Sequence, residues 1–111
     1  MATIKDMKNK PNSAFLQFFG KKPRIRVLDF FLTYPKFSYS KSRVARLTGV
    51  SRITMDKIWD DLIKKKIIVK TGETKKGSLY KLNVYNPVVK ALLEFDLELA
   101  SLYIEVMINE D

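Results

Sequence analysis

The sequence contains neither cysteine nor histidine. Without them the chain forms no disulfide, no ordinary zinc site and no Ser/His or Cys/His nucleophile pair. Catalysis would depend on carboxylates, lysine or tyrosine, and the adjacent Asp60 and Asp61 cannot share one face of a helix as an acid/base pair. Motifs of known catalytic or metal sites are also missing. We therefore expect a protein that is not an enzyme and that needs no metal or other cofactor.

Long apolar runs are missing as well. No stretch approaches the roughly 18–20 apolar residues that a membrane span requires, and the first residues lack the apolar core and small-residue cleavage site of a signal peptide. Nevertheless, 46% of the 111 residues are hydrophobic, which is enough for one folded domain with a modest core. We expect a cytoplasmic protein that does not associate with a membrane.

Positive charge is concentrated in the first three quarters of the chain. Residues 1–84 contain 20 Lys+Arg and 6 Asp+Glu, a net charge of +14, whereas residues 85–111 contain 1 and 6, a net charge of −5; together they give +9. A basic body favours a polyanionic partner, and an acidic end favours a second surface that is kept away from that partner.

Apolar spacing and capping residues predict four helices in the first part of the chain. They are expected at residues 14–19 after Ser13, from Pro23 to the break at Tyr34-Pro35, at residues 41–48 after Ser40, and from Ser51 to about Lys65. The polar, lysine-rich residues 1–12 are expected to be a flexible basic arm.

The apolar period then changes from helical to alternating. The runs "IIVKT" and "SLYKLNV" are typical of strands, and "GETKKG" between them predicts a hairpin with a six-residue loop. Asn86-Pro87 then begins a long helix of about residues 87–108. The predicted fold is mainly α with a small β-hairpin, divided into the arm, a body of residues 13–84 and a C-terminal helix in residues 85–111.

The stretch "ARLTGVSRITMDKI", residues 45–58, has the spacing of two helices that cross at a tight turn. Ala45 is small where the two backbones approach, and Gly49 permits a positive φ at the bend. Val50, Met55 and Ile58 would seat the second helix on the first. This stretch resembles a helix-turn-helix, and with the hairpin that follows, residues 23–84 resemble the winged helix-turn-helix family. The C-terminal helix resembles the dimerisation helix of MarR-like archaeal and bacterial regulators.

The resemblance implies sequence-specific binding to double-stranded DNA, with the helix from Ser51 in the major groove. Asp56 departs from the basic pattern expected there; it would pair with Arg52 or Lys57, or accept from a cytosine amino group. The expected base contacts are Ser51, Arg52, Ile53, Thr54 and Lys57, of which Arg52 suits guanine best. The expected contacts to the DNA backbone are Ser40, Lys41, Ser42, Arg43 and Arg46 before that helix, and Lys75 and Lys76 at the wing tip.

The C-terminal helix carries an apolar seam with spacings of 4, 3, 4, 3 and 4 residues. It consists of Val88, Leu92, Phe95, Leu99, Leu102 and Val106, and a second stripe runs beside it. Because two apolar faces exceed what a small body can cover, we expect a homodimer on a pseudo-palindromic operator. Alternatively, the helix with Phe15, Phe18 and Phe19 covers the surplus face within one chain, although we favour both helices joining the dimer.

The main prediction is therefore a dimeric transcriptional regulator located in the cytoplasm, at the nucleoid. Three alternatives remain: a DNA-coating or plasmid-partition adaptor of the same fold, a winged-helix protein–protein interaction module, and a plain helical hairpin in a small α/β domain. The strongly basic body argues against the protein module. MarR-like dimers often bind small-molecule effectors between the body and the dimer helices, but no convergent polar group marks such a pocket here.

Overall fold

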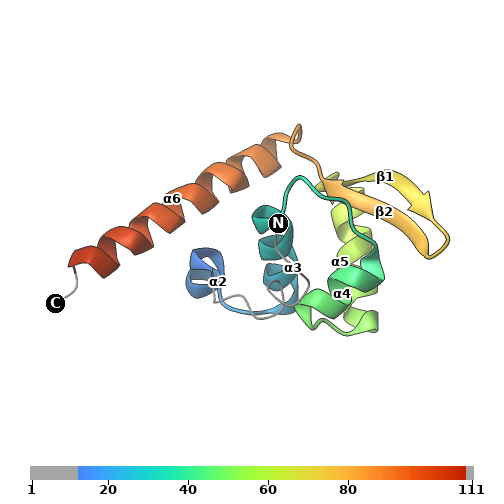
Figure 1. Cartoon of the computed structure of the whole chain (residues 1–111), viewed down its shortest axis with the longest axis horizontal. Coiled ribbons are helices and arrows are strands. Elements are labelled where there is room, and N and C mark those ends of the chain that lie inside the picture. The colour runs from blue at the N-terminus through green and yellow to red at the C-terminus, as the bar shows by residue number, and fades with distance from the viewer. Residues whose placement is uncertain (1–12, 110–111) are drawn as a thin grey trace.

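The computed structural model describes residues 13–109, which form helices and a two-stranded antiparallel hairpin (Figure 1). The elements are α2 (Ala14–Phe19), α3 (Pro23–Thr33), α4 (Lys41–Thr48), α5 (Arg52–Lys64), β1 (Ile68–Thr74), β2 (Gly77–Leu82) and α6 (Pro87–Asn109). The prediction of a mainly helical chain with a small hairpin and a long C-terminal helix is confirmed. The predicted arm, residues 1–12, lies outside the described residues.

Serine caps set the beginnings of three helices. The side-chain oxygens of Ser13, Ser40 and Ser51 accept from backbone N–H groups three residues further on, at 3.1, 3.3 and 3.3 Å. Gly49 ends α4 in the left-handed region, at a φ of 72°. The sequence placed these helix boundaries correctly because capping is a local interaction.

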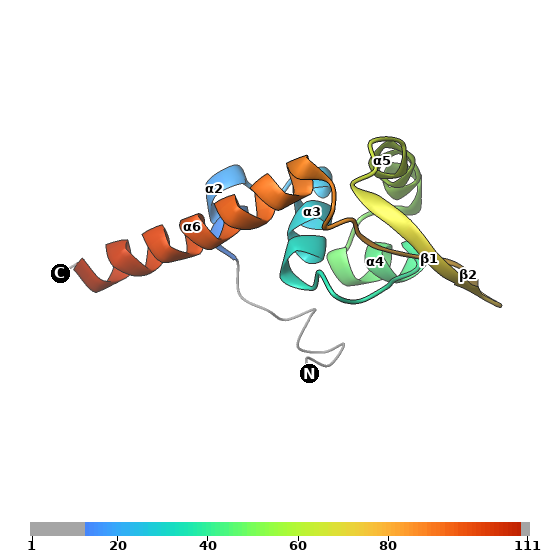
Figure 2. The same ribbon diagram turned by 90° about the horizontal axis from the view of Figure 1, so that it is seen from above.

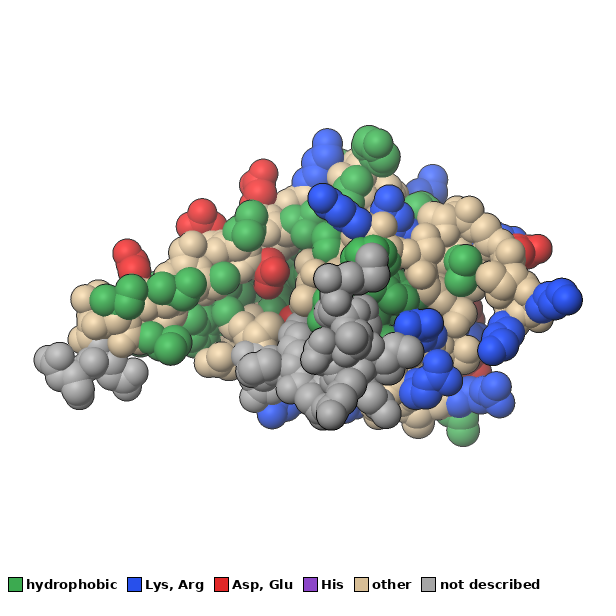
Figure 3. All heavy atoms as spheres, viewed as in Figure 1, with side chains coloured by type: hydrophobic (Ala, Val, Ile, Leu, Met, Phe, Trp, Pro, Cys, Tyr) green, Lys and Arg blue, Asp and Glu red, His purple; other side chains and the backbone are tan. Residues whose placement is uncertain are grey.

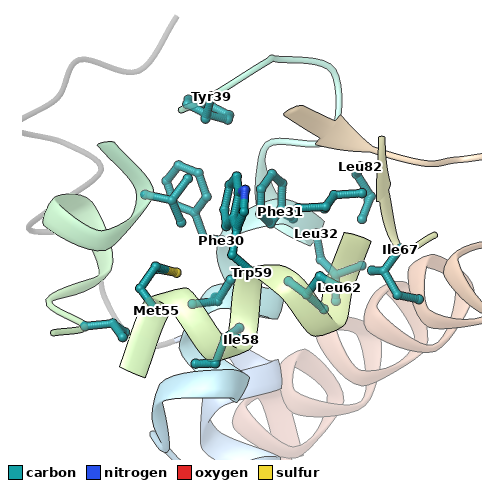
Figure 4. Packing of buried hydrophobic residues seen from close by; sticks show 14 of the residues in the cluster. Phe30, Phe31, Leu32, Tyr39, Met55, Ile58, Trp59, Leu62, Ile67 and Leu82 are labelled. Carbon is teal, nitrogen blue, oxygen red and sulfur yellow. The ribbon is translucent and has the colours of Figure 1, made fainter. Parts of the chain in front are cut away.

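The central element is α3, which contacts α2, α4, α5, α6 and β2. Figures 1 and 2 show it between α6 on one side and the α4–α5 pair on the other. Val27 and Phe31 of α3 have no exposed surface. The Phe31 ring lies 5.7 Å from that of Trp59 of α5 (Figure 4). The Trp59 ring in turn lies 5.6 Å from that of Tyr80 of β2. This row of rings joins α3, α5 and the hairpin.

The hairpin differs from its prediction in the length of its loop. The strands pair as far as Thr74 opposite Gly77, so only two residues lie between them, and the six-residue loop is wrong. Gly72 lies inside β1, where the register shifts after Lys70, and does not begin the loop. A glycine within a strand often marks such an irregularity, and sequence alone does not separate it from a turn glycine.

The segment between α3 and α4 is anchored to the hairpin. The backbone N–H groups of Tyr39 and Tyr80 donate to one another's carbonyls, at 2.8 and 2.9 Å. The hydroxyl of Thr71 donates to that of Ser38 at 2.7 Å. Burial raises the pKa of the Tyr39 hydroxyl, an effect that the charge of Arg43 partly offsets. The hairpin is therefore held in place beside α4.

The first half of α6 packs on the body, and the rest extends away from it (Figures 1 and 2). Val89 and Leu99 are buried, at 0% and 3% exposure, and α6 also contacts α2. The ring of Phe95 lies 6.0 Å from Phe18 and 5.8 Å from Phe19 of α2. No helix within residues 13–109 is long and apolar enough to cross a membrane.

The predicted seam of α6 is therefore divided. Leu99 is buried in the core of its own chain and therefore cannot contact a partner chain. Leu92 is partly buried and packs against the same core. Val88, Phe95, Leu102 and Val106 keep exposures of 57%, 39%, 50% and 54%. The division arises because the seam lies only partly over α2 and α3, a relation that helical spacing does not reveal.

Two asparagines join the end of α5 to the beginning of α6. The Asn86 amide nitrogen donates to the carbonyls of Lys65 and Lys66, at 3.2 and 3.0 Å, while its oxygen accepts from the N–H of Val88 at 2.8 Å. The Asn83 amide nitrogen also donates to the Lys66 carbonyl, at 3.0 Å. One side chain thus caps α6 and satisfies the open carbonyls beyond the end of α5.

Lys66 adopts a left-handed conformation at the end of α5, with a φ of 59°. Its N–H donates to Ile63 and that of Ile67 donates to Leu62, the two bonds of a Schellman motif. Glycine adopts this conformation without steric cost.

We expect Lys66→Gly to raise the free energy of unfolding by about 0.5–1 kcal/mol, measured by urea denaturation. In contrast, Lys64→Gly, within the helix, should lower it by up to about 1 kcal/mol; a loss in both variants would contradict the prediction.

Candidate nucleic-acid interface

The first two turns of α5 present a polar face to solvent. Residues predicted to contact bases lie on it together: Ser51, Arg52, Ile53 and Lys57 are exposed and Thr54 is half-buried. Ile53 is 75% exposed, so its side chain is open to contact with a partner. The opposite face, formed by Met55, Ile58, Trp59 and Leu62, is buried. The helix therefore sits on the body by one side and leaves the other open.

The residues predicted to contact the DNA backbone flank this face. Lys41 and Ser42 stand at the beginning of α4, beside the capping Ser40, and Arg46 is exposed in its last turn. Arg43 is half-buried, and its Nε atom is buried without a hydrogen-bond partner. Lys75 and Lys76 are exposed at the hairpin turn. Figure 3 shows Lys and Arg side chains gathered over the hairpin end of the molecule and Asp and Glu along α6.

A hollow of about 420 Å³ lies between α5, the hairpin and the start of α4. It is lined by Lys41 of α4, Arg52 and Asp60 of α5, Lys76 of the hairpin turn and Ser78 of β2, among others. Sequence reasoning missed Ser78 and Asp60. Ser78 follows the predicted six-residue loop, which is shorter in the structure. The sequence draws attention to Asp60 only as a possible catalytic carboxylate. Within residues 13–109, no group of acidic side chains suits a metal ion.

Asp56 has a different partner from the ones predicted. Its carboxylate lies 2.7 Å from the Lys41 ammonium group, an ion pair between α5 and the start of α4. The prediction had named Arg52 or Lys57, which lie near Asp56 in sequence. The pair with Lys41 depends on the crossing of the two helices, which the spacing of apolar residues did not specify. Lys41, Arg52 and Asp56 line a second hollow of about 210 Å³ between α4 and α5.

A second ion pair positions α5 from its other end. The Asp61 carboxylate accepts from Arg24 at the start of α3, at 2.5 Å, and from Lys65 at 3.0 Å. These hydrogen bonds, with that of Lys65 the larger effect and that of Arg24 the second, hold the pKa of the Asp61 carboxyl below its ordinary value. The charged carboxylate therefore favours the folded chain.

We expect Asp61→Asn to reduce the free energy of unfolding at about pH 7, where the wild-type carboxylate is charged. Because the pKa is lowered in the folded state, this stabilisation is present above the unfolded-state pKa. It is lost as the pH falls through the folded-state value. The two proteins should therefore converge in acid, below the folded-state pKa of Asp61, as followed by Trp59 fluorescence during urea denaturation. Asp60→Asn serves as the control, and an unchanged difference in acid would contradict the assignment.

The geometry brings together an exposed helix face, a flanking set of cations and a groove beside the hairpin. Comparison with known proteins adds no relative: the chain matches no family model, no curated protein and no solved structure. A function for the chain is accordingly inferred from the placement of its own residues.

Proposed function

We propose that the chain binds double-stranded DNA as a winged helix-turn-helix protein and regulates transcription as a homodimer. One observation carries the proposal: the open face of α5 lies near the half-exposed Lys41 at the start of α4 and the exposed Lys75 and Lys76 at the hairpin turn. An α-helix with its side chains is about 10–12 Å across and the major groove is about 12 Å wide. The face therefore has the size, charge and exposure of a reading helix.

Each group of residues has a distinct role in this proposal. Arg52 reads guanine through O6 and N7, and Ile53 or Thr54 meets a thymine methyl group. Lys41, Ser42 and the backbone N–H groups at the start of α4 hold a phosphate. The hairpin acts as the wing, with Lys75 and Lys76 at the adjacent minor groove. The DNA backbone that separates the major groove from the minor groove then passes along the hollow between α5 and the hairpin.

A second copy of the chain is the proposed partner of the apolar surface of α2 and α6. Phe18 and Phe19, at 54% and 45% exposure, adjoin Phe95 on this surface. With Val88, Leu102 and Val106 they expose on the order of 500 Å² per chain. A symmetric pair would then bury about 1,000 Å², the lower limit of a specific interface. The acidic residues of α6 would keep this surface away from DNA.

A second candidate is supported by another set of side chains on α6. Leu97, Ile104 and Ile108 are 69%, 57% and 74% exposed, and helical spacing places them on the flank opposite Phe95 and Leu102. A dimer that buries the flank of α6 with Phe95 and Leu102 leaves the opposite flank exposed, where a third copy of the chain could bind. Chains associated in this way along a duplex would form the DNA-coating adaptor.

The DNA-binding proposal is tested by selecting duplexes from a random library and measuring affinity by fluorescence anisotropy at about 150 mM salt. We expect the selected duplex to bind at least about a hundredfold more tightly than a shuffled one. Arg52→Ala should lose about 1–3 kcal/mol on the selected duplex alone, because it removes a base contact. Arg46→Ala should weaken both duplexes equally, because it removes a phosphate contact.

Lys90→Ala, a cation removed from α6, is the control and should bind like the wild type. Equal affinity for both duplexes, with many chains bound per duplex, would favour the DNA-coating adaptor. Absence of binding to either duplex, even at low salt, would contradict both functions and leave a protein partner for the basic surface.

The dimer is tested by sedimentation equilibrium. We expect a mass of twice the 12.9 kDa of one chain. Leu102→Glu should give the monomer, because it places a charge in the apolar interface without disturbing the core. Ser101→Glu introduces the same charge at the neighbouring exposed position and should remain dimeric. A monomeric wild-type protein, or identical masses for the two variants, would rule out this surface as the interface.

A further inference from the structure

An acidic residue occupies the middle of the proposed DNA-reading face. The Asp56 carboxylate and the Lys41 ammonium group lie 2.7 Å apart, and their side chains are 50% and 43% exposed. The other carboxylates of the described body lie elsewhere: Asp29 is buried, Asp60 is one turn further along α5, and Asp61 and Glu73 pair with nearby cations. Asp56 is therefore the carboxylate that approaching DNA meets in the first two turns of α5.

Its position has an electrostatic cost for the proposed function. DNA is a dense polyanion, so a free carboxylate on this face repels it. Lys41 neutralises the carboxylate, but while the pair is closed its charge is balanced by Asp56 and does not replace a counterion on a phosphate. Because exposed ion pairs contribute little to stability, a competing partner can open this one.

The competing partners come from the DNA itself. In the major groove, cytosine presents the N4 amino group as its hydrogen-bonding group, and a carboxylate can accept from it. Adenine presents an N6 amino group beside the N7 acceptor, whereas guanine and thymine present only acceptors. A cytosine opposite Asp56 would satisfy the carboxylate and release Lys41 to a neighbouring phosphate. With guanine or thymine, the carboxylate keeps Lys41 or stands unpaired against the duplex, and at adenine the neighbouring N7 acceptor repels the carboxylate that its amino group would bind.

We propose that Asp56 is a specificity-determining residue, which withholds Lys41 from the phosphates of random DNA and releases it when a cytosine amino group takes its place. This inference rests on the proposed DNA-binding function. It assigns to Asp56 the rejection of wrong sequences, a role distinct from the favourable contacts expected of Arg52.

The test compares Asp56→Asn with Glu98→Gln, which makes the same change in net charge on α6. On random duplex, Asp56→Asn should bind about tenfold more tightly, and the slope of log affinity against log salt should steepen by about 0.9 because Lys41 now meets a phosphate. On the selected duplex its affinity should change little or fall, so the preference drops at least about tenfold. Glu98 is exposed and the Asp56 side chain is half exposed, and unchanged thermal melting would establish that both variants are folded.

A double-mutant cycle isolates the pair. On random duplex, Lys41→Met should leave the salt slope nearly unchanged in the wild type, where the pair keeps Lys41 from the phosphates. It should abolish the steepening of that slope in the Asp56→Asn background. If Lys41→Met reduces the salt slope equally in both backgrounds, or if Asp56→Asn behaves like Glu98→Gln, the inference is overturned while the DNA-binding function stands. A wild type that binds no duplex overturns both.

Discussion

The row of aromatic rings through the core is the contact on which the proposed interface depends. Phe31 of α3 meets Trp59 of α5, and Trp59 meets Tyr80 of β2, so three elements distant in sequence are set against one another by edge and tilted ring contacts. These rings lie directly beneath the groove between α5 and the hairpin, which Trp59 and Tyr80 help to line. The same side chains thus form the core and the floor of the candidate site. Close packing at this point sets the distance between helix face and hairpin, and hence the size of a ligand that fits between them.

The remaining surface is divided by polarity. Exposed cations stand on α4, α5 and the hairpin turn, whereas α6 presents carboxylates and large apolar side chains. Since the two regions lie at opposite ends of the molecule in Figures 1 and 3, a polyanion at one end and a protein surface at the other do not compete. DNA binding and dimerisation, the two proposed activities, would therefore use separate surfaces of one small chain. Within the basic end, the ion pair of Lys41 with Asp56 also balances some of the positive charge.

Sequence reasoning succeeded where interactions are local and failed where they join distant segments. Serine caps and Gly49 predicted the helix boundaries because a cap is formed within a few residues. Heptad spacing found the apolar residues of α6 but did not show that α2 and α3 would bury Leu99 and leave Leu102 exposed. The partner of Asp56 was missed for the same reason, since Lys41 lies 15 positions earlier and approaches only where α4 crosses α5. The hairpin loop was predicted too long because Gly72 has the same signature in a bulge as in a turn.

The hydrogen bonds of Asn83 and Asn86 fix the beginning of α6 relative to the end of α5. Asn86 binds the carbonyls at the end of α5 with the same side chain that starts α6, and Asn83 adds a third hydrogen bond to those carbonyls. In sequence the whole hairpin lies between the two helices, and these hydrogen bonds attach the beginning of α6 directly to the end of α5. In a pair of chains joined through α6, the angle between the two α5 helices would then be set at these two amide groups. Any ligand or neighbour that shifted α6 would turn α5 with it.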